Sequence, residues 1–488
     1  MAPLTRLALA SIAAAGLGQA APLTKSSSCN AVQQWTKQLK QTITWGPCPD
    51  EFPATLTCAT YLVPLDWNQI HGKGNETVEL GMVRREADDK ENRIGYLFIN
   101  PGGPGGQATS AVASLADLVA PEIQAKFDII GLDPRGVGIS TPVQCDPEVF
   151  NKRVKFMPKT DAEYEALVQY NKDLGANCLE KTGPLLNYVD TISAAKDHEA
   201  VRIALGEKAT YLGLSYGTQL FSQYAQLFPD SFRAIALDGN LQHSQSESTN
   251  LLVEGTTYEA TLKQFFDWCT SDESCALQGK DVAAVFNSVR DKASAAPIPA
   301  PGCDDVSCRS DVTEEDFLFT AQGFLISQRN WPALGEGLLE ADNGNATIIS
   351  EFNQIAVGDA YEDSYLYAGT AIGCQDWAHA STELADLLEK QDLGKVFSPM
   401  TLGASQSYRL QTSCIGWPAP LSNPPRPYRL QGQEDAAHGL HSEIKNAVLL
   451  TRNGSGHTSY TLGGDTTQLT NSYLVNLTLP EPGTITSS

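Results

Sequence analysis

The sequence predicts an α/β protein in which a mostly parallel, doubly wound sheet carries an inserted helical cap. In the first half, short apolar runs rich in β-branched residues alternate with segments whose apolar residues recur at helical spacing. Such alternation is typical of a parallel sheet covered by helices on both faces. From about residue 242, helical patterns follow one another without a strand-like run between them, and aromatic residues gather there. A last strand-like run at 447–451 indicates a return to the sheet.

The elements of the first half can be placed along the chain. The expected strands are 78–83, 96–100, 127–132, 210–214 and 234–238. The expected helices between them are 108–125, 192–205 and 218–228. Each strand run is short and apolar, as expected for strands buried on both faces.

The second half divides into a cap and a C-terminal return. The expected cap helices are 258–269, 314–328, 331–342 and 382–391, and a proline-rich stretch at 417–427 ends the region. A short helical tail at 467–475 closes the chain. We therefore predict four parts: a signal peptide (1–20), the first part of the core (21–241), the cap (242–420) and the second part of the core (421–488).

Composition and the N-terminus predict a secreted, extracellular protein. The chain has 488 residues and a net charge of −23, from 57 acidic and 34 basic side chains. Such an acidic protein repels phosphate backbones, so nucleic acid is excluded as an expected partner. Arg6, the short apolar run 7–17 and the small residues at 18–20 resemble a cleavable signal peptide. No later run reaches 18 apolar residues, so no membrane association is expected.

Export changes how the 11 cysteines are interpreted, because an oxidising compartment favours disulfides. Short spacings suggest the pairs Cys48–Cys58, Cys269–Cys275 and Cys303–Cys308, and two further pairs, Cys145–Cys178 and Cys374–Cys414, could close longer loops. Cys29 is then left over. A zinc site is disfavoured because no histidine lies at ligand spacing from the close pairs. Glycosylation sequons occur at Asn75, Asn345, Asn453 and Asn476.

The most informative motif is the pentapeptide Gly-Leu-Ser-Tyr-Gly at 213–217. It lies between an apolar run and an amphipathic run, which is the context of a nucleophile elbow: a strand ends, the chain turns sharply, and a helix begins after Ser215. Glycines flank the serine because side chains there would clash as strand and helix close on each other. The N–H of Tyr216 then points at the oxygen of a reacting carbonyl.

A serine nucleophile needs a base, and His457 is the best placed of the seven histidines. It follows the last expected strand in the segment Asn-Gly-Ser-Gly-His, so its loop belongs to the sheet edge that carries the elbow. A cap inserted between serine and histidine accounts for their wide separation.

Two glycine-containing segments follow early strands. The segment Asn-Pro-Gly-Gly-Pro-Gly-Gly (100–106) can place a second N–H for an oxyanion hole. A phosphate-binding loop is disfavoured there because no Gly-Lys-Ser/Thr follows. The segment Asp-Pro-Arg-Gly-Val-Gly-Ile-Ser (133–140) is interpreted as a buried, ion-paired turn that braces the site.

Taken together, the segments at 100–106, 133–140 and 213–217 and a fourth, Gly-Ser-Gly-His-Thr-Ser-Tyr at 454–460, resemble the secreted tripeptidyl-aminopeptidase branch of the proline-iminopeptidase-type α/β-hydrolases. The resemblance runs from about residue 48 to 484. It implies an α/β-hydrolase fold and a Ser-Asp-His hydrolase that removes short peptides from free N-termini without a cofactor or metal. It makes Ser215 the nucleophile, His457 the base, and Gly103 and Tyr216 the oxyanion donors.

The sequence departs from this family at the acidic residue of the catalytic triad. The family carries that residue after a penultimate strand, but the interval 428–446 has no run of four apolar residues that could form this strand. Three explanations stay open: the sequence lacks a segment, Asp435 or Glu434 replaces the acid, or Asp238 serves from the end of the strand 234–238. Loss of the acid costs about four orders of magnitude in kcat, and a missing interior strand leaves backbone groups unpaired. We therefore expect a chain of low stability or low activity.

Three functions fit these residues. The first is a secreted serine aminopeptidase acting through an acyl-enzyme on Ser215. The second is an esterase or amidase on a small metabolite, because the same site accepts any acyl group. The third is a catalytically impaired scaffold, which the missing acid favours and the intact serine and histidine oppose. The expected partner is thus a peptide or small acyl substrate; the sequence leaves the oligomeric state open.

Overall fold

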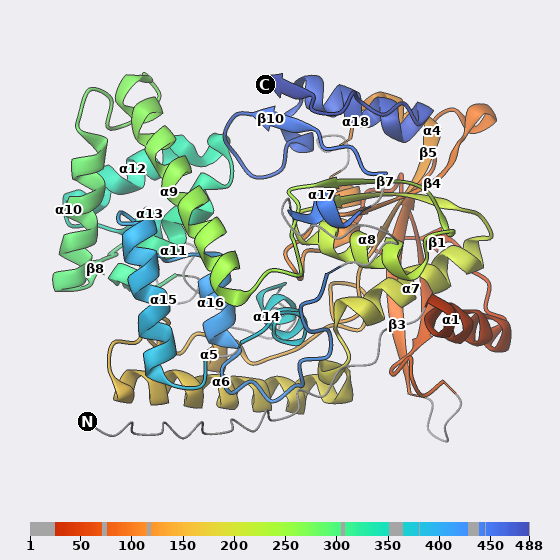
Figure 1. Ribbon diagram of the computed structural model, residues 1–488, viewed down its shortest axis with the longest axis horizontal. Helices are drawn as coiled ribbons and strands as arrows, with labels where there is room; N and C mark the ends of the chain where they lie inside the picture. Colours follow the sequence, from red (N-terminus) through yellow and green to blue (C-terminus); the bar gives the residue numbers. More distant parts are fainter. Residues whose placement is uncertain are drawn as a thin grey trace, which may run out of the picture.

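A seven-stranded sheet, with the strand order β1-β2-β3-β5-β4-β6-β7, forms the centre of the core (Figure 1). The computed structural model describes residues 25–70, 76–114, 119–303, 308–350, 365–379, 381–427, 439–444 and 446–487. The strands are β1 (Gly46–Pro47), β2 (Thr57–Pro64), β3 (Thr77–Arg85), β4 (Gly95–Asn100), β5 (Phe127–Leu132), β6 (Ala209–Leu214) and β7 (Phe232–Asp238).

The sheet has an antiparallel part and a parallel part. β1, β2 and β3 pair antiparallel, and β3 pairs antiparallel with β5. β5, β4, β6 and β7 pair parallel. The α/β fold and the five strands expected in the first half of the chain are confirmed, while β1 and β2 were not predicted. Because parallel strands end at the same edge, the segments that follow β4, β5, β6 and β7 all start there.

The two faces of the sheet bury different side chains. Along β4, Phe98 belongs to one hydrophobic cluster, while Leu97 and Ile99 belong to another, as the alternation of a strand requires. The first face is covered by α1 (Lys25–Leu39), α7 (Thr191–Leu205) and α8 (Tyr216–Leu227). The second is covered by α2 (Ala108–Ala113), α4 (Pro121–Lys126) and α18 (Gly464–Asn476).

The single helix expected at 108–125 is wrong, because the structure describes two shorter helices, α2 and α4. Pro121 occupies the first turn of α4, and Ala120 before it adopts φ −57° and ψ 149°. A proline disfavours helical backbone at the residue before it, so a new helix begins at this point.

The cap has a hydrophobic cluster of its own, built around Phe265, Phe317 and Trp331. In Figure 1 its helices lie to the left of the sheet. Residues 242–420 contain α9 (Glu247–Ser271), α10 (Val282–Ala295), α11 (Glu314–Leu325), α12 (Trp331–Asp342), α13 (Thr347–Ser350), α14 (Tyr365–Asp376), α15 (Leu384–Phe397) and α16 (Gln406–Ser413). Against expectation, this region also contains a short antiparallel pair, β8 (Ile298–Pro299) with β9 (Asp311–Val312). A two-residue strand leaves too little apolar alternation to be seen in sequence.

A long helix inserted between β5 and α7 joins the two halves. α5 (Pro147–Phe150) leads to α6 (Asp161–Thr182), which runs along the lower side of the molecule in Figure 1. The Asn171 amide of α6 donates hydrogen bonds to the carbonyls of Thr412 and Ile415, at 2.8 and 2.9 Å. Single 3₁₀ turns lie at Lys90–Asn92, Gly183–Asn187, Gln328–Asn330 and Tyr460–Leu462.

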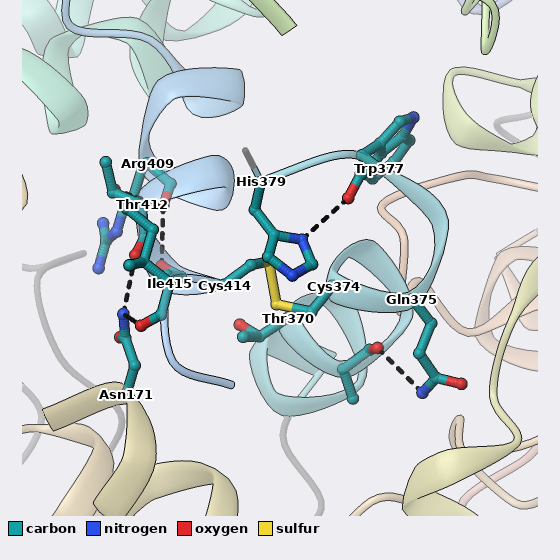
Figure 2. The surroundings of a disulfide bond; sticks show 12 residues. Asn171, Thr370, Cys374, Gln375, Trp377, His379, Arg409, Thr412, Cys414 and Ile415 are labelled. Atoms are coloured by element: carbon teal, nitrogen blue, oxygen red, sulfur yellow. Dashed lines mark hydrogen bonds between the residues drawn. A yellow bond between two sulfur atoms is a disulfide. The ribbon is translucent and has the colours of Figure 1, made fainter. Parts of the chain in front are cut away.

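All five expected disulfides are confirmed. Figure 2 shows one of them, Cys374–Cys414, which joins α14 to the end of α16. The others are Cys48–Cys58, Cys145–Cys178, Cys269–Cys275 and Cys303–Cys308, and Cys29 lies outside these bonds. Within the described residues, no helix is both long and apolar enough to cross a bilayer.

The expected core strand at 447–451 is wrong. β10 (Thr451–Asn453) pairs parallel with β11 (Ile485–Ser487) in a separate small sheet, and α17 (Gly439–Glu443) precedes it. Among the described strands, β7 is therefore the last of the main sheet. Of the apolar run, only Thr451 belongs to β10 and pairs with the C-terminal segment. Residues 447–450 lie outside the described strands, and their side chains are half-buried or exposed.

Candidate active site

Ser215 lies at a sharp turn between β6 and α8, as the pentapeptide predicted. Its backbone adopts φ 55° and ψ −124°, a strained conformation for a residue with a side chain. Its N–H donates to the Asp238 carbonyl at the end of β7, at 2.8 Å. A Cβ on Gly213 would lie 2.4 Å from the Gly217 carbonyl oxygen, and a Cβ on Gly217 would lie 2.6 Å from the Asn100 carbonyl oxygen, which explains why both positions are glycine. The turn thus presents the serine at the carboxyl edge of the sheet.

The loop after β4 packs directly against this turn. A Cβ on Gly102, where φ is +99°, would lie 2.7 Å from the Ser215 Cβ and 2.9 Å from the Tyr216 nitrogen. Asn100 holds the loop through its side-chain oxygen, which accepts the Gly102 N–H at 3.0 Å. Gly103 follows with φ +115°. Tyr216 directly follows the serine, and Gly103 directly follows the glycine that packs against it. The role of both residues as oxyanion donors stays a prediction.

His457 reaches the same turn from the C-terminal part of the chain. A Cβ on Gly239 would lie 3.3 Å from His457 Cε1 and 3.5 Å from the Ser215 nitrogen, so imidazole and serine adjoin one glycine. The backbone N–H of His457 donates to the carbonyl of Ile326, at the end of α11, at 2.7 Å. His457 is an exposed residue, yet the protein around its ring lowers its pKa below the usual 6.5. The imidazole is consequently neutral at pH 7 and able to accept a proton.

Asp238 is the carboxylate that the structure places beside this histidine. Its Oδ2 accepts the N–H groups of Ser459 and Tyr460, at 2.7 and 2.6 Å, and so fixes the loop that carries His457. Its charge raises the pKa of His457, partly offsetting the larger effect of burial, and Glu254 of the cap adds to that offset. No hydrogen bond joins the imidazole to the Asp238 carboxylate among the described residues. Asp238 thus acts on the histidine through charge and through the loop backbone.

Some predicted site residues remain as predictions. Asp435 and Glu434 lie outside the described residues, as does the sequon Asn75. Asn453 and Asn476 are exposed, whereas Asn345 is half-buried and its side-chain oxygen accepts the hydroxyl of Thr347 at 2.7 Å. The signal peptide at 1–20 also falls outside the described part of the chain.

The turn after β5 is buried and ion-paired, as expected. The Arg135 guanidinium bonds both oxygens of Asp197, at 2.6 and 2.7 Å, and both side chains are almost fully buried. Asp133 accepts the backbone and side-chain donors of Thr109 at the start of α2, at 2.9 and 2.8 Å. Burial raises the Asp133 pKa to about 6. The turn therefore ties β5 to α2 and α7 behind the elbow.

A buried polar network under the elbow was missed by the sequence analysis. Asp376, the last residue of α14, accepts the backbone N–H of Thr191 at 3.0 Å, the Asn423 amide at 2.9 Å and the Gln219 amide at 3.1 Å. The Thr191 hydroxyl bonds both Asp376 and the Tyr216 hydroxyl. The network thus links the cap to the residue that follows the nucleophile. No local motif marks it, because its members come from four distant segments.

Asp376 makes the stability of the protein depend on pH. Burial raises its pKa from 3.8 to about 7, so the folded state binds this proton more tightly than the unfolded state. The stabilisation is complete below pH 4 and declines as the pH rises towards 7. We expect the free energy of unfolding of the wild type, minus that of Asp376→Asn, to fall by up to about 1.4 kcal/mol per pH unit in this window. Urea unfolding at pH 4.5, 5.5, 6.5 and 7.5 measures it.

The exposed Asp173→Asn on α6 serves as the control for removing a carboxylate, and it should show no such slope. A difference between wild type and Asp376→Asn that does not change with pH would contradict the assignment.

A sheet of this topology with a serine at the strand–helix turn is typical of the α/β serine hydrolases. Residues 96–362 match the family model for the alpha/beta hydrolase fold, and residues 398–486 match that for TAP-like proteins. The chain belongs to the alpha/beta hydrolase fold family, and its C-terminal part is similar to TAP-like proteins.

Three curated relatives have a described function. Serine protease Hip1 of Mycobacterium tuberculosis is 27% identical over 485 residues, covering 91% of each chain. Tripeptidyl aminopeptidase of Streptomyces lividans is 32% identical over 273 residues, covering 53% of this chain and 50% of the relative. Carboxylesterase B of M. tuberculosis is 28% identical over 431 residues, covering 83% and 81%. With the family match, these similarities show a serine hydrolase of the peptidase type.

Proposed function

We propose that this protein is an exported aminopeptidase that releases short peptides from free N-termini through an acyl-enzyme on Ser215. The observation that carries the proposal is the convergence of three segments on one turn: the strained serine, the glycine loop after β4 and the loop of His457. The names of two relatives, a serine protease and a tripeptidyl aminopeptidase, support peptide chemistry. Five disulfides support export to an oxidising compartment.

The proposed reaction follows from the positions of these groups. The Ser215 hydroxyl attacks the scissile carbonyl while His457, neutral because its pKa is lowered, takes the hydroxyl proton. The N–H groups of Gly103 and Tyr216 bind the oxyanion that forms. His457 then gives its proton to the leaving amine, and water attacks the acyl-enzyme by the reverse steps.

Asp238 stands in the proposed mechanism as the positioning carboxylate. It holds the backbone after His457, and its negative charge favours the imidazolium that forms during attack. This role replaces the family's acid with a residue at the end of β7, one of the alternatives drawn from the sequence.

A substrate panel tests the aminopeptidase proposal. We expect hydrolysis of tripeptide amides with a free amine and at least about a hundredfold lower kcat/KM for the same peptides carrying an N-acetyl group, because binding to the charged amine is lost. Ser215→Ala distinguishes this activity from a contaminant. Equal rates on blocked and free peptides would contradict the aminopeptidase assignment.

An esterase is the second candidate, because a relative covering most of the chain is named a carboxylesterase. Fast hydrolysis of short-chain p-nitrophenyl esters, together with no cleavage of any peptide in the panel, would favour it. Failure of a fluorophosphonate probe to label Ser215 would instead favour the non-catalytic scaffold.

A further inference from the structure

A cavity of about 300 Å³ lies away from the elbow, between the segment after α5 and the cap helices α11 and α16. Its walls come from Phe150 and residues 152–156, from Tyr170 of α6, and from Arg309, Thr313, Glu315, Asp316, Phe319 and Arg409. Cavities of this size accept small ligands. Neither the nucleophile nor the histidine contributes to it.

The lining is unusually basic for a chain with a net charge of −23. Lys152, Arg153, Lys155, Arg309 and Arg409 face two carboxylates, Glu315 and Asp316. Both carboxylates already have partners, since Glu315 accepts the N–H groups of Phe156 and Met157, and Asp316 pairs with Arg153 and caps α11. Arg153 also pairs with Asp311, which lies outside the lining. The lining itself carries five basic side chains against these two acidic ones.

Arg409 is the clearest sign of a missing partner. Its guanidinium lies 5.0 Å from the centre of the Phe156 ring and 5.6 Å from that of Phe319. No carboxylate among the described residues pairs with it. In Figure 2 its guanidinium points away from the Cys374–Cys414 disulfide. A guanidinium held between two rings keeps its N–H groups oriented for bidentate binding of an anion.

Arg309 is a second arginine of the lining. Its guanidinium donates to the carbonyl of Asn151 at 3.0 Å, and burial is the largest influence on its pKa, which it lowers. The charge of Asp316 raises that pKa, while the charges of Arg153 and Arg409 lower it.

We propose that the cavity binds a small aromatic carboxylate, whose carboxylate bonds Arg409 and whose ring packs against the aromatic wall. The wall consists of Phe150, Phe156, Tyr170 and Phe319. Four aromatic residues beside the arginines select an anion that carries an apolar ring over a bare inorganic ion.

The probe for the test is 3-phenylpropionate, measured by isothermal titration calorimetry on the full chain. We expect a Kd of about 10⁻⁴ M, within the range open to a ligand of this size. The uncharged 3-phenylpropanol and the ringless propionate should each bind at least about tenfold more weakly, because each lacks one half of the recognition. Inorganic phosphate that binds as tightly as 3-phenylpropionate would overturn the aromatic carboxylate as the ligand class.

Variants locate the binding. Arg409→Gln should weaken binding about tenfold or more, and the exposed Lys155→Gln severalfold; the second variant covers the case in which the first fails to fold. The exposed Arg329→Gln, outside the cavity, is the matched control and should leave Kd unchanged. Unchanged binding in both cavity variants would overturn the proposal, as would loss of binding in Ser215→Ala or His457→Ala, since that would place the probe in the active site.

Discussion

Replacing Ser215 by alanine should lower kcat by about 10⁴- to 10⁶-fold, because the hydroxyl is the proposed nucleophile and no neighbouring group can form the acyl-enzyme in its place. This corresponds to about 5–8 kcal/mol of lost transition-state stabilisation. His457→Ala should cost about as much, and the double variant little more, because serine and base act as a unit. Steady-state kinetics with a free-amine tripeptide amide measures all three.

Two further serine variants separate chemistry from folding. Ser222→Ala removes a buried hydroxyl from the same helix, where it bonds only the Gln219 carbonyl, and should leave kcat unchanged. Ser215→Gly should be inactive but more stable than the wild type by about 1 kcal/mol, because glycine adopts φ 55° without strain. Retention of more than a tenth of the activity in Ser215→Ala would place the nucleophile elsewhere.

Asp238→Asn has the second largest expected effect, a fall in kcat of about 10³- to 10⁴-fold. The substitution removes the charge that favours the imidazolium of His457 and weakens the hydrogen bonds that fix its loop. The same kinetic assay measures it, with the intact mass confirming that the assayed chain has the printed sequence.

The pH profile shows whether Asp238 acts on the histidine or only supports the fold. The negative charge of Asp238 raises the pKa of His457, so its removal lowers that pKa. The acid limb of kcat/KM should therefore move to lower pH in Asp238→Asn, while a purely structural role would leave the limb in place.

Two carboxylate variants complete this test. Glu207 lies just before β6, at the opposite edge of the sheet, and pairs with Arg93. Glu207→Gln should therefore change neither kcat nor the pH profile. Asp435→Asn is the direct competitor. If it reduces kcat by orders of magnitude and Asp238→Asn does not, Asp435 is the acid.

Much of the fold could be predicted because the central strands are local signals. β4, β5 and β6 are short, apolar and buried on both faces, so their pattern survives in the sequence without knowledge of their neighbours. Three of the disulfides, Cys48–Cys58, Cys269–Cys275 and Cys303–Cys308, were predictable for a related reason, since close spacing limits which cysteines can meet. The sharp turn at Ser215 was equally visible in the sequence, because only glycines tolerate the close packing on either side of this serine.

The errors came from segments whose structure depends on distant partners. The run at 447–451 has the composition of a core strand, but β10 pairs with the C-terminal β11 instead. The Asp376 network joins residues from α7, α8, α14 and the segment around Asn423, none of which shows a pattern of its own. The basic cavity likewise collects arginines that lie far apart in the chain.

The sequence by itself determined the α/β class, the strained elbow at Ser215 and the glycine loop that packs against it, since each depends on residues close together in the chain. Only the tertiary structure decided that Asp238, a residue with the local context of a plain turn, holds the loop of His457. Hydrogen bonding and charge act over distance in space, and 219 residues separate these two along the chain. The carboxylate beside the histidine was therefore one alternative among several until the ends of β7 and the C-terminal loop could be seen together.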